Sequence, residues 1–155
     1  MKIDRFVDGW SFLSNFDPPP IWFNGFLCQT LEHAYQAAKA TTLTDMKLII
    51  DCPTPNLAKK LGRKITKRPD WEQVKLLVMK DLVRQKFWNP EYAAKLLSTG
   101  NHELIEGNTW NDTFWGVCKG VGENNLGKIL MAVRSELAQF DLLLRLSFKN
   151  LRNTP

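Results

Sequence analysis

The sequence predicts a mainly α-helical fold, a single compact helical domain over residues 1–155 with a small β-hairpin element near its N-terminus. In several segments apolar residues recur at steps of three and four between capping residues and Gly or Pro stops, as in amphipathic helices. The pair Asn24-Gly25 between two short apolar runs indicates the hairpin. At 155 residues, with 44% hydrophobic and 24% charged residues, the chain has the size and composition of one globular domain.

Composition also narrows the compartment and the partners. No apolar run approaches the roughly 18 residues of a membrane span and no secretion signal follows the start, so we expect a cytoplasmic protein without a membrane partner. Three widely spaced cysteines, Cys28, Cys52 and Cys118, favour free thiols in a reducing compartment. With two histidines and no Cys/His spacing of a metal site, we expect neither a metal nor a cofactor. The net charge of +5 favours anionic partners such as phosphorylated metabolites or nucleic acid.

Short strands and turns are expected over residues 3–28, where Ile21–Phe23 and Phe26–Cys28 form the two arms of the hairpin. A helix over Thr30–Ala40 follows directly, with Thr30 as its N-cap and four alanines as good helix formers. Its spacing places a carboxylate, a phenol, a carboxamide and an amine on one face, namely Glu32, Tyr35, Gln36 and Lys39. A solvated polar face is the plain alternative for this pattern.

Two shorter helices are predicted next. One covers Asp45–Ile50, and the other runs over Thr54–Leu61, with a proline at its first position and Gly62 as its C-terminal stop. The following stretch, residues 63–69, is the most basic in the chain. Its arginines are candidates for phosphate contacts or are simply solvated.

A longer helix is predicted over Trp71–Trp88, opened by a capping box of Asp70 and Gln73. Asn89-Pro90 starts another helix, which Gly100 closes. The apolar stripe of the longer helix comprises Val74, Leu77, Val78, Leu82, Phe87 and Trp88.

The last third of the chain combines irregular and helical segments. Residues 103–106 favour a short strand. Residues 107–127 hold five of the nine glycines and form a predicted loop of a length that is commonly functional. A long helix is expected from Leu126 to at least Leu137, with residues 138–155 as a C-terminal helical extension.

Two stretches of this loop are candidates for chemistry. Asp112 beside Trp115 is suited to act on a base or sugar that stacks on the flat indole, although a turn aspartate next to a core tryptophan explains the same residues. Residues 119–125 form a glycine-rich turn into a helix, whose free amides, with Lys119, would face an anion. A simple turn is again the alternative.

Eight motifs stand in order along the chain. They are F-L-S-N-F (12–16), E-H-A-Y-Q-A-A-K-A (32–40), G-R (62–63), D-W-E-Q-V-K (70–75), K-F-W-N-P (86–90), T-G (99–100), D-T-F-W-G (112–116) and G-E-N-N-L-G-K-I-L-M-A-V-R (122–134). Together they resemble the NADAR, or YbiA-like, family over roughly residues 6–137. Cys118 departs from the family pattern, which often has glycine there.

The resemblance implies a mainly α-helical fold and N-glycosidase activity. Some members cleave the base–ribose bond of phosphorylated aminopyrimidine intermediates in riboflavin synthesis, and others remove ADP-ribose from modified guanine in nucleic acid. We therefore expect the partner to be a phosphorylated ribose-containing small molecule or ADP-ribosylated nucleic acid. The residues expected to act in catalysis are Glu32, Lys39 and Asp112. The residues expected to bind the substrate are Asn15, Tyr35, Gln36, Arg63, Trp115, Gly116, Lys119 and Gly122.

Two roles remain open for Lys39. Cleaving an N-glycosidic bond builds positive charge on the ribose, which an ionised Glu32 or Asp112 would stabilise, and the first-turn position of Glu32 favours its ionised form. As a nucleophile, Lys39 would form a Schiff base at C1, but at an ordinary pKa near 10.4 only about one lysine in 2,500 is neutral at pH 7. Its pKa would have to fall by about three units through burial or nearby cations, and Glu32 would oppose that. In a dry, basic pocket Lys39 is the nucleophile, which the family resemblance favours; otherwise it binds the substrate as a cation.

Two other functions fit the same sequence. A catalytically silent module would bind ADP-ribose or NAD without turnover. A nucleic-acid-binding domain would use Arg63, Lys64, Lys67 and Arg68 with exposed aromatic rings. Its binding would depend strongly on salt and would survive the loss of Glu32.

Overall fold

The computed structural model describes residues 1–152, and the side chains of residues 1–147. Its helical elements are η1 (Asp8–Leu13), α1 (Leu31–Ala37), α2 (Leu43–Ile50), α3 (Pro55–Gly62), α4 (Trp71–Phe87), α5 (Pro90–Ser98) and α6 (Asn125–Arg152). The strands pair as β1 (Lys2–Ile3) with β4 (Glu103–Leu104), β2 (Ile21–Phe23) with β3 (Phe26–Cys28), and β5 (Gly107–Asn108) with β6 (Val117–Cys118). The predicted mainly helical fold is confirmed. Residues 153–155 of the predicted C-terminal extension lie outside the described residues.

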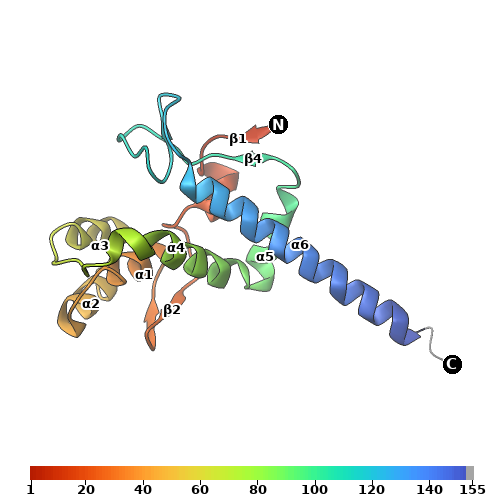
Figure 1. Ribbon diagram of the computed structural model, residues 1–155, viewed down its shortest axis with the longest axis horizontal. Coiled ribbons are helices and arrows are strands. Elements are labelled where there is room, and N and C mark those ends of the chain that lie inside the picture. The colour runs from red at the N-terminus through yellow and green to blue at the C-terminus, as the bar shows by residue number, and fades with distance from the viewer. Residues whose placement is uncertain (153–155) are drawn as a thin grey trace.

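Helix α1 lies at the centre of the helical cluster. It packs against α2, α3 and α4, and α4 in turn packs against the long α6, which also contacts α5. Figure 1 shows α1, α2 and α3 gathered at one end of the molecule, with α6 crossing the body and projecting beyond it. The alanines of α1 make this crowding possible, because Ala34 and Ala37 are buried and leave room for close neighbours.

The N-terminal ends of the helices follow their capping residues. The Thr30 hydroxyl accepts a hydrogen bond from the His33 N–H, and Thr54 and Asn89 cap α3 and α5 in the same way. Thr42 caps α2, which therefore begins two residues before the predicted Asp45.

The α1 helix ends earlier than the sequence predicts, at Ala37 instead of Ala40. The basic stretch explains the difference, because it pairs with the chain that leaves α1. The Arg68 N–H donates to the Lys39 carbonyl over 2.9 Å, and Ala40 forms a β-bridge with Lys67. Lys39 therefore lies in a turn that two segments hold.

The hairpin prediction is confirmed, with Asn24 and Gly25 both in the left-handed region at φ of 48° and 81°. The capping box at α4 is wrong: the Asp70 carboxylate does not cap the helix and instead accepts two hydrogen bonds from the Arg68 guanidinium, over 2.5 and 2.8 Å. The predicted stripe of α4 is wrong at Leu77 and Trp88, which are exposed. The buried residues of α4 are Trp71, Met79, Leu82, Val83, Lys86 and Phe87.

The predicted loop over residues 107–127 is more ordered than the sequence suggests, because it contains the parallel pair β5–β6. It then delivers α6, whose 28 residues confirm and extend the predicted long helix. No helix in residues 1–152 combines the length and apolarity needed to cross a membrane.

Candidate active site

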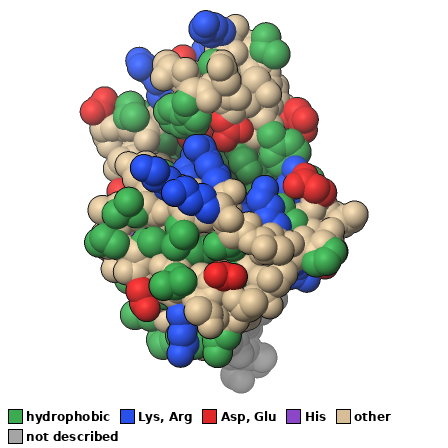
Figure 2. Space-filling model, turned by 90° about the vertical axis from the view of Figure 1, so that its left-hand side faces the viewer, with side chains coloured by type: hydrophobic (Ala, Val, Ile, Leu, Met, Phe, Trp, Pro, Cys, Tyr) green, Lys and Arg blue, Asp and Glu red, His purple; other side chains and the backbone are tan. Residues whose placement is uncertain are grey.

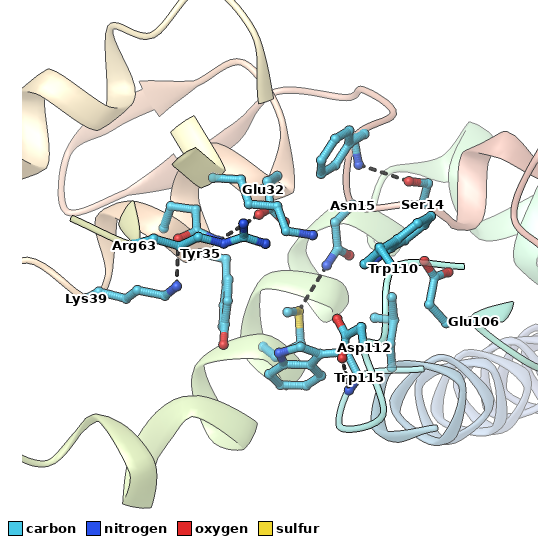
Figure 3. Close-up of a pocket in the computed structure, with 15 residues that line it drawn as sticks. Ser14, Asn15, Glu32, Tyr35, Lys39, Arg63, Glu106, Trp110, Asp112 and Trp115 are labelled. Carbon is cyan, nitrogen blue, oxygen red and sulfur yellow. Dashed lines mark hydrogen bonds between the residues drawn. The ribbon is translucent and has the colours of Figure 1, made fainter. Parts of the chain in front are cut away.

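A cavity of about 210 Å³ is enclosed mainly by the turn after η1, helix α1, helix α3 and the loops between β4 and β6, with one residue each from α4 and α6. Its lining combines carboxylates, cations and aromatic rings within one space (Figure 3). The lining residues are Ser14, Asn15, Phe16, Glu32, Tyr35, Gln36, Lys39, Lys59, Arg63, Met79, Glu106, Trp110, Asp112, Trp115 and Leu126.

The polar face of α1 forms a hydrogen-bonded chain along one wall. The Lys39 Nζ donates to Gln36 Oε1 over 2.6 Å, and Gln36 Nε2 donates to Glu32 Oε1 over 2.7 Å. The three side chains are buried, with Lys39 8% and Glu32 5% exposed. The alternative of a solvated polar face is therefore wrong, because α2, α3 and α4 enclose this helix.

Burial shifts the pKa values at both ends of this chain toward the neutral forms. It raises the pKa of Glu32, although the Gln36 hydrogen bond and the charges of Lys59 and Lys39 act in the other direction. The sequence argument that the helix dipole keeps Glu32 ionised thus meets a larger opposing effect. Burial also lowers the pKa of Lys39 to about 8.

Neighbouring cations contribute to the low pKa of Lys39. The charges of Lys67, Arg63 and Lys59 lower it, while Glu32 raises it. Lys and Arg side chains gather across the middle of the face shown in Figure 2, next to a recessed acidic side chain. The dry and basic surroundings that a nucleophilic lysine requires are both present.

Aromatic rings form the wall beside Lys39. The Tyr35 ring lies 5.1 Å from Trp71 and meets Trp115 edge-on at 5.5 Å, measured between ring centroids. Lys39 Nζ lies 5.3 Å from the centre of the Tyr35 ring. Burial raises the pKa of Tyr35 above its ordinary value, so this phenol stays neutral.

Asp112 is held in a tight turn at the opposite wall. Its Oδ1 accepts the Trp115 N–H over 2.9 Å, and Asn108 brackets the same turn by accepting the Asp112 N–H and donating to the Asp112 carbonyl. Asp112 is therefore a turn aspartate, as the alternative interpretation of the sequence predicts. The same turn also places Asp112 and Trp115 on the cavity, as Figure 3 shows.

The structure brings most of the sequence-predicted site residues together. Eight of the eleven line the cavity: Asn15, Glu32, Tyr35, Gln36, Lys39, Arg63, Asp112 and Trp115. Gly116, Lys119 and Gly122 do not line it. Gly122 packs against the Gly116 carbonyl, where a Cβ would collide, and Lys119 lies at an adjoining hollow of about 630 Å³.

Sequence reasoning missed five polar or aromatic residues of the cavity: Ser14, Phe16, Lys59, Glu106 and Trp110. Lys59 lies in the helix before the basic stretch, and its Nζ lies 5.8 Å from the Trp110 ring centre and 5.7 Å from that of Phe16. Trp110 lies in the same loop as Asp112 and is 58% exposed. Among the described residues, no three His, Cys, Asp or Glu side chains are arranged to hold a metal ion.

Gly62 lets helix α3 pack closely against the Gln36 side chain of α1, whereas the C-cap of α3 is Arg63. Gly62 is the last residue of α3, one residue beyond the predicted end at Leu61, and a Cβ placed on it would collide with Gln36 Oε1. The absence of a side chain therefore leaves Gln36 free to bridge Lys39 and Glu32.

We expect Gly62→Ala to lower kcat at least about tenfold and to destabilise the fold by about 1–3 kcal/mol, since an added methyl group must push Gln36 out of its bridging position. Steady-state kinetics and thermal unfolding measure the two effects. Gly9→Ala is the matched control, because a Cβ there meets nothing within 4 Å. Unchanged kcat in Gly62→Ala would show that the Gln36 bridge is dispensable.

Comparison with known proteins shows what this chain is similar to. Residues 5–138 match the NADAR domain. An N-glycosidase from Nostoc punctiforme is 40% identical over 131 residues, which cover 80% of this chain and 83% of that protein. The N-glycosidase YbiA from Escherichia coli is 38% identical over 135 residues, covering 84% of both chains.

The fold is similar as well. The NMR structure of E. coli YbiA matches with a TM-score of 0.81 at 34% identity, over 92% of this chain and 86% of that one. A riboflavin biosynthesis protein from Vibrio vulnificus is 38% identical over 132 residues, but these cover 83% of this chain and 36% of that longer protein.

Proposed function

The chain belongs to the NADAR family and is an N-glycosidase, and we propose that it hydrolyses the bond between a purine or pyrimidine base and a phosphorylated ribose. Two substrates share this chemistry: ADP-ribosylated guanine in nucleic acid and a phosphoribosyl aminopyrimidine intermediate of riboflavin synthesis. The name of the Vibrio relative supports the second, and the cations around the cavity suit the phosphate of either. Free Cys28, Cys52 and Cys118 suit a reducing cytoplasm, which is where we place the activity.

The observation that carries the proposal is the buried chain Lys39–Gln36–Glu32. At a pKa of about 8, roughly one Lys39 side chain in eleven is neutral at pH 7, about two hundred times the fraction of an ordinary lysine. This difference favours the nucleophile over the substrate-binding cation. The Gln36 amide orients the amine, and because both of its ends are engaged it holds Lys39 and Glu32 in place rather than binding the substrate as expected from the sequence.

The reaction proceeds in two stages on these residues. The Lys39 amine bonds to C1 of the ribose as the C1–N bond to the base breaks, and the ribose ring then opens to a Schiff base. Water adds to the Schiff base, with Asp112 accepting its proton, and Lys39 is released. The ionised form of Glu32, a stronger base because its pKa is raised, takes up the proton that the Lys39 amine loses and returns it when Lys39 is released.

The rest of the cavity binds the substrate. The rings of Tyr35 and Trp115 provide an apolar wall for the sugar or base, and Arg63 and Lys59 provide charge for phosphate. The Asn15 carbonyl accepts the Glu32 N–H over 2.9 Å, which ties the Ser14–Phe16 turn to the start of α1.

A mass-spectrometric assay for released base tests the proposal. The panel holds ADP-ribosylated guanine in DNA, a phosphoribosyl aminopyrimidine and NAD, each with wild type, Glu32→Ala and Lys39→Ala. We expect the wild type to release base from one of the first two substrates and both variants to lose that activity. The substrate that is cleaved distinguishes nucleic acid from a free nucleotide.

Two other outcomes would point to the other function classes. Measurable ADP-ribose or NAD binding without release from any substrate would indicate a silent binding module. Salt-dependent binding of nucleic acid that survives Glu32→Ala would indicate a nucleic-acid-binding domain.

A further inference from the structure

We infer that Glu106 is a further catalytic residue, the acid that protonates the departing base as the C1–N bond breaks. The inference rests on the proposed function, because it requires a base to leave a ribose in this cavity. The sequence motifs do not include Glu106, which is the last residue of a short predicted strand.

The backbone of Glu106 is fixed at the junction of the two hollows. Its N–H donates to Asn124 Oδ1 over 3.0 Å, and its carbonyl accepts the Val117 N–H over 2.8 Å. The side chain lines the catalytic cavity and also borders the adjoining hollow. In Figure 3 it lies across the cavity from Lys39, with its carboxyl group directed toward Trp110.

One oxygen of this carboxyl group lacks a protein partner. Glu106 Oε2 is buried, and it is the sole buried side-chain oxygen or nitrogen in residues 1–147 without a hydrogen bond. Burying an oxygen atom without a hydrogen bond costs on the order of 1–3 kcal/mol. Because this oxygen lies at the wall of a cavity, we infer that a bound ligand supplies the missing hydrogen bond. A protonated carboxyl oxygen in this position donates to a base nitrogen.

The charges around Glu106 favour its protonated form. Burial raises its pKa to about 7, and the charges of Asp112 and Glu32 act in the same direction, while Lys59 opposes them. A carboxyl group that titrates near neutral pH is suited to general acid catalysis. The other charged residues that face it, across the adjoining hollow, are Lys2, Asp4, Arg5 and Lys119.

The step balances with the groups already present. As the Lys39 amine bonds to C1, the electron pair of the C1–N bond moves to the base, and the proton of the Glu106 carboxyl group goes to a ring nitrogen of that base. The base leaves neutral and Glu106 becomes a carboxylate. The proton that Asp112 accepts from the hydrolysing water then passes to Glu106 and restores its carboxyl group. Glu106 and Lys39 lie on opposite sides of the cavity, as attack and departure on opposite faces of C1 would require.

The test uses whichever panel substrate the wild type cleaves, with kcat measured from pH 5.5 to 9.5. We expect Glu106→Gln to lower kcat by about 10²–10⁴-fold with little change in KM. Between about pH 7 and 8 the growing fraction of neutral Lys39 offsets the ionisation of Glu106, so the wild-type kcat should fall above about pH 8. This descending limb should be absent in Glu106→Gln. Formate should partly restore the rate of Glu106→Ala, which a merely structural role would not allow.

Glu103→Gln, at an exposed glutamate of the same segment, is the control and should match the wild type. A Glu106→Gln variant with kcat within about threefold of wild type overturns the inference. A wild-type pH profile of kcat without a descending limb overturns it as well, and this second measurement needs only the wild-type protein. Base release that needs Lys39 but not Glu106 would overturn this inference and leave the proposed function intact. Absence of release by the wild type would overturn both.

Discussion

Lys39→Met is expected to lower kcat for base release by at least about 10³-fold while leaving the fold intact. Met matches the length and apolar stem of lysine but has no amine to bond to C1, so the covalent route closes. The variant also removes a buried amine whose pKa is lowered to about 8, so it should unfold no more easily than the wild type at neutral pH. Steady-state kinetics and circular dichroism of the purified variant give the two readouts.

Trapping separates the nucleophile from the substrate-binding cation. With cyanoborohydride and substrate, the wild type should gain the mass of the reduced ribosyl adduct on the peptide that contains Lys39, and Lys39→Met should gain none. Lys60→Met is the control, because Lys60 is an exposed lysine of α3 that does not line the cavity. Normal turnover by Lys39→Met would rule out the Schiff base, whereas a raised KM with unchanged kcat would make Lys39 a binding cation.

Much of the site follows from local sequence. The spacing of Glu32, Gln36 and Lys39 predicts that they share one helix face, because helical periodicity alone determines this. The prediction is the same whether the face is buried or exposed to solvent. The burial of that face is a tertiary property: it depends on α2, α3 and α4 closing around α1. The pKa shifts of Glu32 and Lys39 depend on the same burial, and no local pattern predicts them.

The residues whose roles the sequence did not predict have one physical feature in common: their partners come from distant or competing segments. Glu106 and Lys59 lie far from α1 in sequence, and only the packing of their segments brings them to the cavity. Gly62 at the end of an apolar pattern resembles a helix stop, but its contact with Gln36 lies between two helices. Asp70 resembles a cap, but the nearby Arg68 competes for its carboxylate. Single-sequence rules describe neighbours along the chain and do not include such partners.

Lys86 shows how a buried charge outside the chemistry supports the site. It lies in α4 with its side chain 1% exposed, and Nζ donates to the carbonyls of Ser14 and Asp17 over 2.7 and 3.1 Å. These bonds hold the turn that contributes Ser14, Asn15 and Phe16 to the cavity. Sequence pattern alone assigns Lys86 no role, because a lysine beside an apolar stripe normally extends into solvent.

Lys86→Met is expected to lower the free energy of unfolding by about 2 kcal/mol at pH 8 and to reduce activity. The thioether fills the space of the lysine stem, but two buried carbonyl oxygens lose their donor, at a cost on the order of 1–3 kcal/mol each, partly offset because no amine has to be buried. Urea unfolding of wild type and variant measures the difference. Lys128→Met, at an exposed lysine of α6, is the control and should be neutral.

The pH dependence of this difference gives the sharper test. Burial lowers the pKa of Lys86 to about 7 in the folded protein, against an ordinary value of 10.5 in the unfolded chain. Between these values the unfolded state binds the extra proton, so the stability that Lys86 contributes rises with pH from about 7 toward 10 and is smallest below pH 7. The difference in the free energy of unfolding between the wild type and Lys86→Met should therefore increase by up to about 1.4 kcal/mol per pH unit over that window. A constant difference from pH 6 to 9 would mean that Lys86 keeps its charge when folded, and that an ammonium group and not a neutral amine holds the Ser14–Asp17 turn.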